Sequence, residues 1–258
     1  MSNGAVTGKL TADLTGRTAL VTGASSGLGR NFSLVLARAG ARVFCAARNA
    51  DKLSDTVTSI IEAGDEAEAI SLDVKDEESV QNAVNACANI DILVNNAGVA
   101  STKRLLDWES PEWDHIMDTN LRGAWMVARA VARQMVKRGS GGSIINIASI
   151  TGERVSGGVM PYAVSKAGVV QLTKAMALEL AGSDVRVNAL SPGYIKTDLN
   201  RDFLESEAGQ KLLKRVPQHR YGEPEDLDGA LLLLASDASK FMHGSVIAVD
   251  GGHLVSSL

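Results

Sequence analysis

The sequence predicts a doubly wound α/β fold, in which helices cover both faces of a mostly parallel sheet of seven strands. Seven apolar runs bounded by turn residues recur along the chain, and each has the length of a strand that is buried on both faces. Such runs are typical of a parallel sheet in the middle of a molecule, because only there are both faces covered. We expect the strands at residues 18–21, 42–46, 67–72, 90–94, 143–148, 185–189 and 245–249.

Helical periodicity fills the stretches between these runs. Apolar residues recur there every three to four positions, as they do on the buried face of a helix. Because strand and helix alternate regularly, we expect right-handed βαβ units and a sheet flanked by helices. We expect the helices at residues 28–39, 51–63, 77–88, 112–137, 162–180 and 225–235.

The chain of 258 residues has no Pro/Gly/Ser-rich linker, and we expect residues 1–258 to form a single domain. Residues 1–15 are small and polar and are expected to form a loose N-terminal tail. Residues 194–222 are rich in charge but carry several apolar side chains, and they lie between a strand and the last helix. We interpret this segment as a lid over the substrate, with a plain pair of surface helices as the alternative.

Composition excludes several classes of partner. The formal net charge of −4 does not suggest a broad basic surface, so nucleic acid is not expected to bind. No apolar run approaches the roughly 20 residues of a membrane span, and we expect a cytoplasmic protein without a membrane partner. Cys45 and Cys87 are expected to be buried thiols, and the four scattered histidines predict neither a metal site nor a Ser-His-Asp triad.

A glycine-rich loop, residues 22–29, follows the first strand and opens the first helix. This context is the one that a dinucleotide-binding loop requires. Glycine lets the backbone turn tightly and approach a pyrophosphate, while unpaired amides and the helix dipole favour negative charge there. The spacing is Gly-x3-Gly-x-Gly, and the loop contains Gly23, Ser25, Ser26, Gly27, Leu28 and Gly29.

The end of the second strand bears on the choice of cofactor. An enzyme that uses NAD usually places an acid about 20 residues after the loop, on the adenine ribose. This chain has Ala47 at the expected position, followed by Arg48. A guanidinium can pair with a 2′-phosphate through two hydrogen bonds, and Ser25 or Ser26 can add hydroxyl donors. The sequence therefore favours NADP, with NAD as the alternative.

Tyr162 and Lys166 lie four residues apart at the start of a helix, so both side chains project from one face. Bringing a phenol from pH 10 within reach of neutral pH takes about three pKa units, or roughly 4 kcal/mol. An ammonium about 4 Å away at an effective dielectric of about 20 supplies on the order of 4 kcal/mol. We therefore expect Lys166 to lower the pKa of Tyr162, which then acts as a general acid and base.

Polar residues near two strand ends strengthen this interpretation. Ser149 follows the strand at residues 143–148, at the edge where parallel sheets present ligand-contacting residues. A hydroxyl there can hold a substrate oxygen. Residues 95–98 read Asn-Asn-Ala-Gly at the end of another strand. Asn120 lies within a long predicted helix, where an amide favours a local irregularity.

In this order, the glycine loop, residues 95–98, Asn120, Ser149, Tyr162, Lys166 and the Pro-Gly pair at 192–193 resemble the short-chain dehydrogenase/reductase family. The match runs from about residue 17 to 252 and implies a Rossmann-like fold. The resemblance implies that Tyr162 is the general acid/base, that Lys166 lowers its pKa and binds the nicotinamide ribose, that Ser149 orients the substrate and that Asn120 maintains a water-linked proton relay. It also implies that the cofactor contacts Tyr162 and Lys166 themselves, with Asp73, Val74, Asn96, Ala97, Gly98, Pro192, Gly193, Ile195 and Thr197.

The expected reaction is reversible hydride transfer between NADP(H) and a small carbonyl compound or secondary alcohol. An NAD-dependent alcohol or sugar dehydrogenase is the main alternative, and a dinucleotide-binding protein without catalysis is a further one. The sequence end, Val-Asp-Gly-Gly at 249–252, resembles family members that form homotetramers, with a dimer as the main alternative. The expected substrate pocket is partly apolar and includes Ile150, Val155, Met160, Tyr194, Leu199 and Phe203.

Overall fold

The computed structural model describes residues 12–198 and 200–256, so most of the predicted N-terminal tail lies outside the described residues. A seven-stranded sheet crosses the molecule in the order β3-β2-β1-β4-β5-β6-β7, and every pair of neighbours is parallel. Each predicted strand is confirmed within a few residues. The strands are β1 (Thr18–Thr22), β2 (Arg42–Ala47), β3 (Ala67–Ser71), β4 (Ile92–Asn95), β5 (Gly142–Ile147), β6 (Val185–Pro192) and β7 (Val246–Val249).

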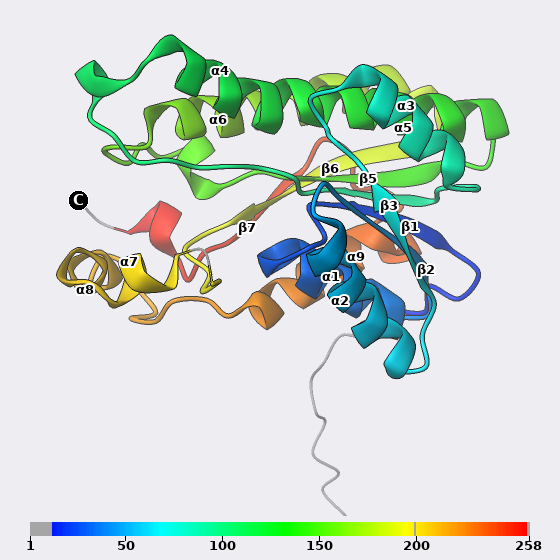
Figure 1. The fold of residues 1–258 in the computed structure, drawn as a ribbon, viewed down its shortest axis with the longest axis horizontal. Helices are drawn as coiled ribbons and strands as arrows, with labels where there is room; N and C mark the ends of the chain where they lie inside the picture. Colours follow the sequence, from blue (N-terminus) through cyan, green and yellow to red (C-terminus); the bar gives the residue numbers. More distant parts are fainter. Residues whose placement is uncertain (1–11, 199, 257–258) are drawn as a thin grey trace, which may run out of the picture.

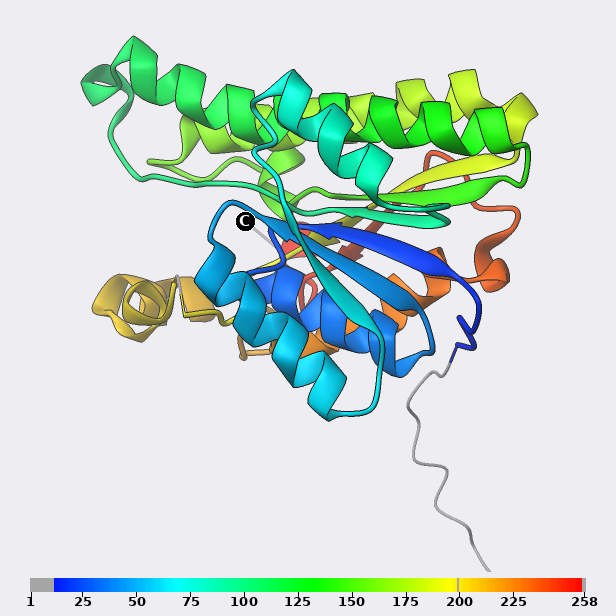
Figure 2. The same ribbon diagram turned by 45° about the vertical axis from the view of Figure 1, so that its right-hand side comes forward.

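Helices cover both faces of this sheet (Figures 1 and 2). In Figure 1, α3, α4, α5 and α6 lie above the strands, and α1, α2 and α9 lie below them. The doubly wound prediction is thereby confirmed. The larger helices are α1 (Gly27–Arg38), α2 (Ala50–Glu62), α3 (Glu77–Ala86), α4 (Ser110–Met117), α5 (Ala124–Arg138), α6 (Met160–Leu180) and α9 (Asp228–Ala235).

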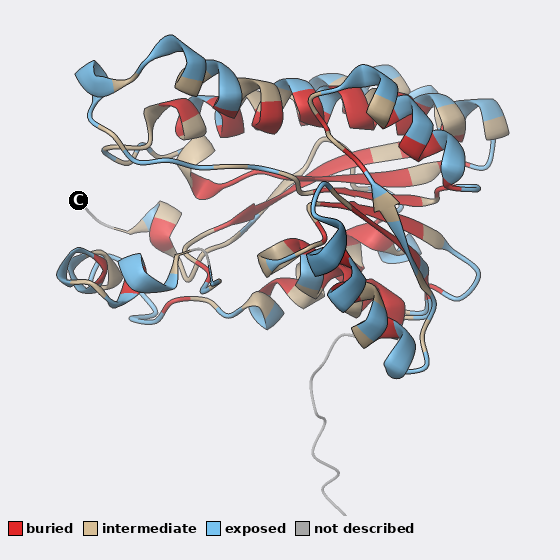
Figure 3. Cartoon of the chain, in the orientation of Figure 1, coloured by how far each residue is buried: buried red, intermediate tan, exposed pale blue. Residues whose placement is uncertain are grey.

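Buried side chains concentrate along the central strands and on the helix faces that meet them (Figure 3). One apolar cluster joins the sheet to α1, α2 and α9, and a second joins it to α3, α5 and α6. The strands read as continuous apolar runs because their side chains enter these clusters on alternate sides. Cys45 and Cys87 lie in the two clusters as free, buried thiols, as expected.

The predicted helix at residues 112–137 contains an irregular turn. Its first part is α4, and a π-helical turn (Asp118–Gly123) joins it to α5. Asn120 lies in this turn, where the sequence predicts a departure from the regular helix. π-turns inside α-helices often occur at functional sites. The π-turn therefore supports Asn120 as a candidate functional residue.

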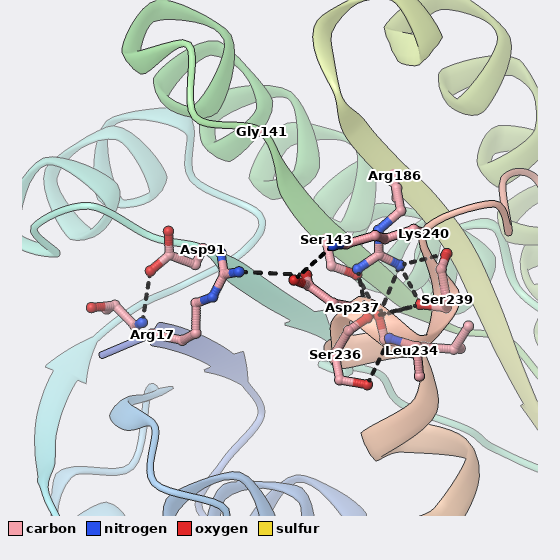
Figure 4. Close-up of polar contacts among 12 residues, drawn as sticks. Arg17, Asp91, Gly141, Ser143, Arg186, Leu234, Ser236, Asp237, Ser239 and Lys240 are labelled. Atoms are coloured by element: carbon pink, nitrogen blue, oxygen red, sulfur yellow. Dashed lines mark hydrogen bonds and ion pairs between the residues drawn. The ribbon is translucent and has the colours of Figure 1, made fainter. Parts of the chain in front are cut away.

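The two strand-end edges of the sheet differ. Near the amino ends of β5 and β6, Arg186 donates from Nη1 to the carbonyl of Leu234 (3.2 Å) and from Nη2 to that of Ser236 (3.1 Å). Figure 4 shows Arg186 among these groups at the end of α9, with Ser143 beside it donating to Leu234. Close by, Asp91 accepts from the backbone of Thr18 at 2.9 Å. Polar contacts within the protein therefore close this edge.

The carboxyl edge is the opposite one. The strand order reverses direction beside β1, which pairs with β2 on one side and β4 on the other. In sheets of this kind, ligands bind outside the carboxyl ends of the strands at such a switch point. The glycine loop, residues 95–98 and Ser149 all follow strands at this edge. The fold thus assembles the predicted site residues in one place.

Residues 194–222 form two short helices, α7 (Arg201–Glu205) and α8 (Glu207–Leu213), which project at one side of the molecule (Figure 1). A cavity of about 860 Å³ lies between this segment and the start of α1. The predicted pair of helices is present, and the lid interpretation stays a proposal. Within residues 12–198 and 200–256, no helix has the length and apolar character needed to cross a membrane.

Candidate active site

The glycine loop has the backbone geometry of a close-approach site. Gly23 and Gly27 adopt positive φ angles of 68° and 51°, which side chains other than glycine rarely tolerate. A Cβ atom at Gly29 would lie 2.1 Å from the carbonyl oxygen of Gly23. At Ser26, which precedes α1, the side chain makes no capping hydrogen bond. The loop therefore leaves backbone donors at a helix start for an anionic group, which fits a pyrophosphate.

Thr22 fixes the end of β4 beside this loop. The hydroxyl of Thr22 accepts hydrogen bonds from the backbone amides of Asn96 and Ala97, both at 2.9 Å. The side-chain amide of Asn96 donates to the carbonyl of Thr22 at 3.0 Å. Asn95 points instead into the interior, where it donates to Asn146 at 3.1 Å. The strand ends are thus held together, and Asn96 and Ala97 lie against Gly23 of the loop. Their predicted contact with the cofactor stays a prediction.

Arg48 stands exposed at the end of β2, just before the Asn49 cap of α2. Its guanidinium has no hydrogen bond or ion pair with another residue that the structure describes. At the next strand end, Asp73 accepts from the backbone of Lys75 at 3.0 Å, and Val74 is buried against Gly123. Arg48, Asp73 and Val74 therefore border the same edge as the glycine loop, which fits contacts with the adenosine end of a dinucleotide.

Asn120 is buried, and its side chain joins three segments. Its Oδ1 accepts from the backbone amide of Val99 at 2.8 Å, and its Nδ2 donates to the carbonyl of Val99 at 2.9 Å. Nδ2 also donates to the hydroxyl of Ser165, next to Lys166, at 3.1 Å. The π-turn is what brings this amide to the start of α6. A Cβ at Gly98 would lie 3.3 Å from Asn120 Oδ1 and 3.7 Å from Lys166 Nζ, so Gly98 lies next to both side chains.

Lys166 is buried, and its ammonium donates to the carbonyl oxygen of Ile147 at 2.7 Å. Burial lowers the pKa of Lys166 from its ordinary value of 10.5 to about 8. A buried ammonium is costly because desolvation disfavours the charged form. The carbonyl at the end of β5 therefore holds the Lys166 ammonium in place, while burial makes this ammonium lose its proton at a lower pH than an exposed lysine would.

Tyr162 departs from the electrostatic expectation. Burial raises its pKa above the ordinary value of 10, the nearby Tyr194 adds to the rise, and a hydrogen bond with Ser149 opposes it. The ammonium of Lys166 lies 5.6 Å from the ring centroid, and it is not among the groups that shift this pKa. The prediction that Lys166 lowers the pKa of Tyr162 is therefore contradicted, since this pKa lies above its ordinary value. The physical reason is that desolvation of the phenol outweighs an ammonium directed at a carbonyl.

Ser149 begins a short turn that packs against α6. Its Oγ accepts from the hydroxyl of Thr151 at 2.9 Å, and the side chain is largely buried. A Cβ at Gly152 would lie 2.8 Å from the backbone of Lys166, so the turn touches the helix that carries the acid/base pair. The hydrogen bond that links Ser149 to Tyr162 follows from this packing. The structure thus brings Ser149, Tyr162 and Lys166 together.

Residues after β6 complete the edge. A Cβ at Gly193 would lie 2.7 Å from Asp250, so Gly193 and its neighbour Pro192 run close to the end of β7. Ile195 is buried and bridges to Gly222. The methyl group of Thr197 lies 3.6 Å from a Cβ placed at Gly27. The segment therefore reaches the start of α1, which fits the predicted contacts with the nicotinamide end.

Sequence reasoning missed an aromatic cluster beside Tyr162. The Tyr194 ring lies 6.4 Å from that of Tyr221 and 5.6 Å from that of His253, centroid to centroid. No signal in the sequence connects these residues, because they come together only when β6 and β7 pair.

Of the predicted pocket residues, Ile150 is buried, Val155 and Phe203 are exposed, Met160 begins α6, and Leu199 lies outside the described residues.

The arrangement can exchange a proton with an oxygen placed between Ser149 and Tyr162, and it can hold a dinucleotide along the glycine loop. In the described part of the chain, no group of three or more His, Cys, Asp or Glu side chains has a geometry suited to a metal ion.

Comparisons with known proteins agree with this geometry. Residues 23–253 match a family model described as enoyl-(acyl carrier protein) reductase, which belongs to the short-chain dehydrogenases/reductases. The chain belongs to the short-chain dehydrogenase/reductase family. It is therefore an oxidoreductase of that family, and the resemblance seen in the sequence is confirmed.

Individual members of the family share most of their length with this chain. Gluconate 5-dehydrogenase from Gluconobacter oxydans is 39% identical over 248 residues, which cover 94% of this chain and 96% of the relative. The 3-oxoacyl-(acyl-carrier-protein) reductase from Thermotoga maritima is 37% identical over 246 residues, covering 94% of this chain and 99% of the relative.

Solved structures of the same family superpose closely. A gluconate 5-dehydrogenase from Burkholderia cenocepacia, in complex with NADP and tartrate, has a TM-score of 0.91 at 38% identity, with 95% of this chain and 98% of that chain covered. A putative 2-deoxy-D-gluconate 3-dehydrogenase from Agrobacterium tumefaciens with bound NADP has a TM-score of 0.90 at 37% identity, with 96% and 100% covered.

Proposed function

We propose that this enzyme transfers hydride reversibly between NADP(H) and a carbonyl compound or secondary alcohol, with Tyr162 as the general acid and base. The observation that carries the proposal is the convergence of Ser149, Tyr162 and Lys166 at the carboxyl edge of the sheet, beside the glycine loop. Asn120, which reaches the start of the same helix, completes the set.

NADP is the proposed cofactor, in preference to NAD. The tight glycine loop fits a pyrophosphate, and the exposed guanidinium of Arg48 makes no ion pair with another described residue, so it is available to a 2′-phosphate. Ser25 and Ser26 lie in the same loop and can add hydroxyl donors. Neighbouring structures with bound NADP support this choice.

The residues of this chain position and move a proton. When bound, the cofactor supplies the hydride acceptor or donor and, in its oxidised form, a positive charge. The raised pKa of Tyr162 keeps its hydroxyl protonated at neutral pH, which suits donation to a carbonyl oxygen. Ser149 accepts or donates a hydrogen bond at the same oxygen and orients it. Lys166 would hold a ribose hydroxyl of the cofactor, and the positive charge of the oxidised cofactor would support the phenolate when an alcohol is oxidised.

Asn120 has a positioning role in this proposal. Its bonds to Val99 tie the segment after β4 to the π-turn, and its bond to Ser165 ties both to α6. The water-linked relay that the family resemblance implies would start at Lys166 and pass this amide. The proposal also treats residues 194–222 as a lid, because they border the large cavity beside the start of α1.

A second candidate function is an NAD-dependent alcohol or sugar dehydrogenase. The names of the relatives favour a secondary alcohol or its ketone, since they include both gluconate 5-dehydrogenase and 3-oxoacyl-(acyl-carrier-protein) reductase. A protein that binds the dinucleotide without catalysis is disfavoured because all four predicted catalytic residues are present. We propose that the enzyme acts in the cytoplasm, as its sequence indicates.

A homotetramer is the proposed assembly, with a dimer as the alternative. A hollow of about 370 Å³ on the outer face of α5 and α6 is lined mainly by apolar side chains, including Leu121, Trp125 and Leu172. Trp125 is 39% exposed, which is high for a large apolar side chain. Contact between copies of this face would cover it, and light scattering of the purified protein distinguishes the two assemblies.

The direct test follows absorbance of the nicotinamide while a panel of ketones, 3-oxoacyl thioesters and polyol acids is offered with NADP or NADPH. Substituting Tyr162→Phe should lower kcat at least 100-fold, since a positioned acid/base contributes about 100- to 10,000-fold. Binding of NADPH, followed by its fluorescence, should remain within a few-fold of the unmodified enzyme. Full turnover by the Tyr162→Phe variant would contradict the mechanism.

A further inference from the structure

Arg154 occupies a place beside the acid/base site that the proposed reaction does not use. It follows Ser149 by five residues, at the end of the same short turn. The amide of Gly152 donates to the carbonyl of Ser149 at 2.9 Å, and the amide of Arg154 donates to that of Ile150 at 2.8 Å. The turn is therefore tight, and the arginine starts within about one helical turn of the substrate-orienting hydroxyl.

The guanidinium of Arg154 makes hydrogen bonds to uncharged groups, and it makes them through Nη1. Its Nη1 donates to the carbonyl oxygen of His253 and, at 2.6 Å, to the hydroxyl of Ser256. Among residues 12–198 and 200–256, no carboxylate forms an ion pair with it. Arg154 is half-buried, and its hydrogen bonds to described residues use Nη1, so Nε and Nη2 are not engaged by these partners. These two nitrogens form one edge of the guanidinium, and that edge presents two parallel N–H groups.

The segment that Arg154 holds also borders the reaction centre. His253 is 6% exposed, and its ring contacts that of Tyr194, with 5.6 Å between centroids. Tyr194 is close enough to Tyr162 to raise the pKa of its phenol. Arg154 therefore holds the segment that contacts Tyr194, a residue near enough to influence Tyr162. A substrate whose reacting carbon lies against Tyr162 would extend from there toward this segment.

Charge around His253 is biased toward the positive sign. Burial lowers the pKa of His253, Arg154 and Arg215 lower it further, and only Asp250 opposes them. The carboxylate of Asp250 already accepts from the backbone amides of Gly252 at 2.8 Å and Leu254 at 2.7 Å. The His253 Nδ1 is buried without a hydrogen-bond partner among the described residues. Two cations and one carboxylate, which is already hydrogen-bonded to the backbone, therefore act on His253, and the exposed Glu153 is the acidic side chain next to Arg154 in the sequence.

We propose that Arg154 binds a carboxylate at the end of the substrate remote from the reacting carbon, so that the enzyme selects hydroxy acids and oxo acids. The inference rests on the proposed function and deepens it. A carboxylate has two oxygens at the spacing of the Nε and Nη2 hydrogens, and such paired contacts are short, strong and directional. The contacts of Nη1 with His253 and Ser256 fix the plane of the guanidinium for this purpose.

The test compares each acid with its own uncharged amide, beginning with D-gluconate and D-gluconamide and continuing through hydroxy acids of four to six carbons. The quantity measured is the ratio of kcat/KM for acid over amide. We expect the unmodified enzyme to favour the acid. The Arg154→Gln variant should lower the ratio about 10- to 100-fold, the effect of losing a charge-assisted bidentate contact. Arg154→Lys should keep part of the preference, since it keeps the charge without the second parallel donor.

Arg215→Gln serves as the matched control, because Arg215 is a second cation beside His253 but lies exposed after α8. Its ratio should stay within about threefold of the unmodified enzyme if Arg154 makes the contact directly. A ratio near one in the unmodified enzyme, or an equal fall in both glutamine variants, would overturn the proposal. Failure of every carbonyl and alcohol to change the nicotinamide absorbance would instead overturn the proposed function. Neutral ketones turned over as well as acids would reject only the carboxylate site.

Discussion

The ammonium of Lys166 lies 2.7 Å from the carbonyl oxygen of Ile147, the last residue of β5, and is sealed inside the protein. The last peptide of a central strand therefore holds the cation that the acid/base site requires. Burial also lowers the pKa of Lys166 to about 8, so its charge depends on pH in the range where the enzyme is expected to work.

Lys166 should titrate near pH 8, since burial lowers its pKa from 10.5 to about 8. The unfolded chain binds the proton more tightly, so between about pH 8 and 10.5 the contribution of Lys166 makes the free energy of unfolding rise with pH. Below pH 8 the buried cation costs on the order of 3 kcal/mol. Denaturant unfolding of the unmodified protein and Lys166→Met across this range should give a difference that increases with pH. A flat difference would show that the ammonium is not desolvated.

Arg48 should determine the preference of the enzyme for NADP over NAD. Substituting Arg48→Ala is expected to weaken NADP binding about 10- to 100-fold, because a charge-assisted contact with the 2′-phosphate is lost. NAD binding should change less than threefold, since NAD carries no such phosphate. Fluorescence titration with NADPH and NADH measures both constants, and substituting Lys52→Ala, which removes an exposed cation in the first turn of α2, provides the control. Equal weakening of the two cofactors would contradict the assignment.

The hydrogen bond made by the Tyr221 hydroxyl should stabilise residues 201–213, which form α7 and α8. Its hydroxyl donates to the carbonyl of Gly209 in α8 at 2.5 Å, and its ring contacts Tyr194. The Tyr221→Phe variant leaves this carbonyl without its donor, a loss of about 1–3 kcal/mol for a buried acceptor. Hydrogen exchange in α7 and α8 should become faster and KM should rise several-fold, while exchange in the central strands stays the same. Unchanged exchange in α8 would argue against a lid that this bond holds.

Arg186 should matter for stability and not for turnover. It donates to the carbonyls of Leu234, Ser236 and Ser239, at the end of α9 (Figure 4). Substituting Arg186→Met removes these hydrogen bonds and a cation from a helix C-terminus, while each carbonyl keeps another donor, such as the Ser143 hydroxyl at Leu234. The free energy of unfolding should therefore fall by about 1–3 kcal/mol. The value of kcat at a temperature below the transition should stay within twofold. A large loss of kcat in the folded variant would refute this separation of roles.

The sequence was sufficient to predict the central strands because they are buried on both faces, and a continuous apolar run is visible without knowledge of the fold. The edge strands β3 and β7 are less buried, but each was still predicted from a short apolar run between turn residues. The strand predicted at residues 185–189 extends to Pro192 in the structure. That extension depends on pairing with β7, which the sequence does not display. Asn120 was predicted to disturb its helix because an amide is a mediocre helix former, and the π-turn agrees.

The sequence alone did not predict contacts between residues that lie far apart along the chain. The bond between Arg154 and His253 spans 99 positions, and it exists only because β6 and β7 bring the chain end back to the turn after β5. The pKa of Tyr162 was misjudged for a related reason. Spacing along a helix indicates that two side chains can meet, but it does not indicate how deeply the phenol is buried or that Lys166 turns toward a carbonyl.

The polar contacts that close the amino edge of the sheet, among them those of Arg186 and Asp91, lie at the opposite ends of the strands from Tyr162 and Ser149. Mutations that accumulate in the loops of the reactive edge therefore leave these stabilising contacts in place. A lineage built on this framework can exchange one substrate for another while these stabilising contacts persist, and an engineer can vary exposed positions of the reactive edge, such as Val155, on the same grounds.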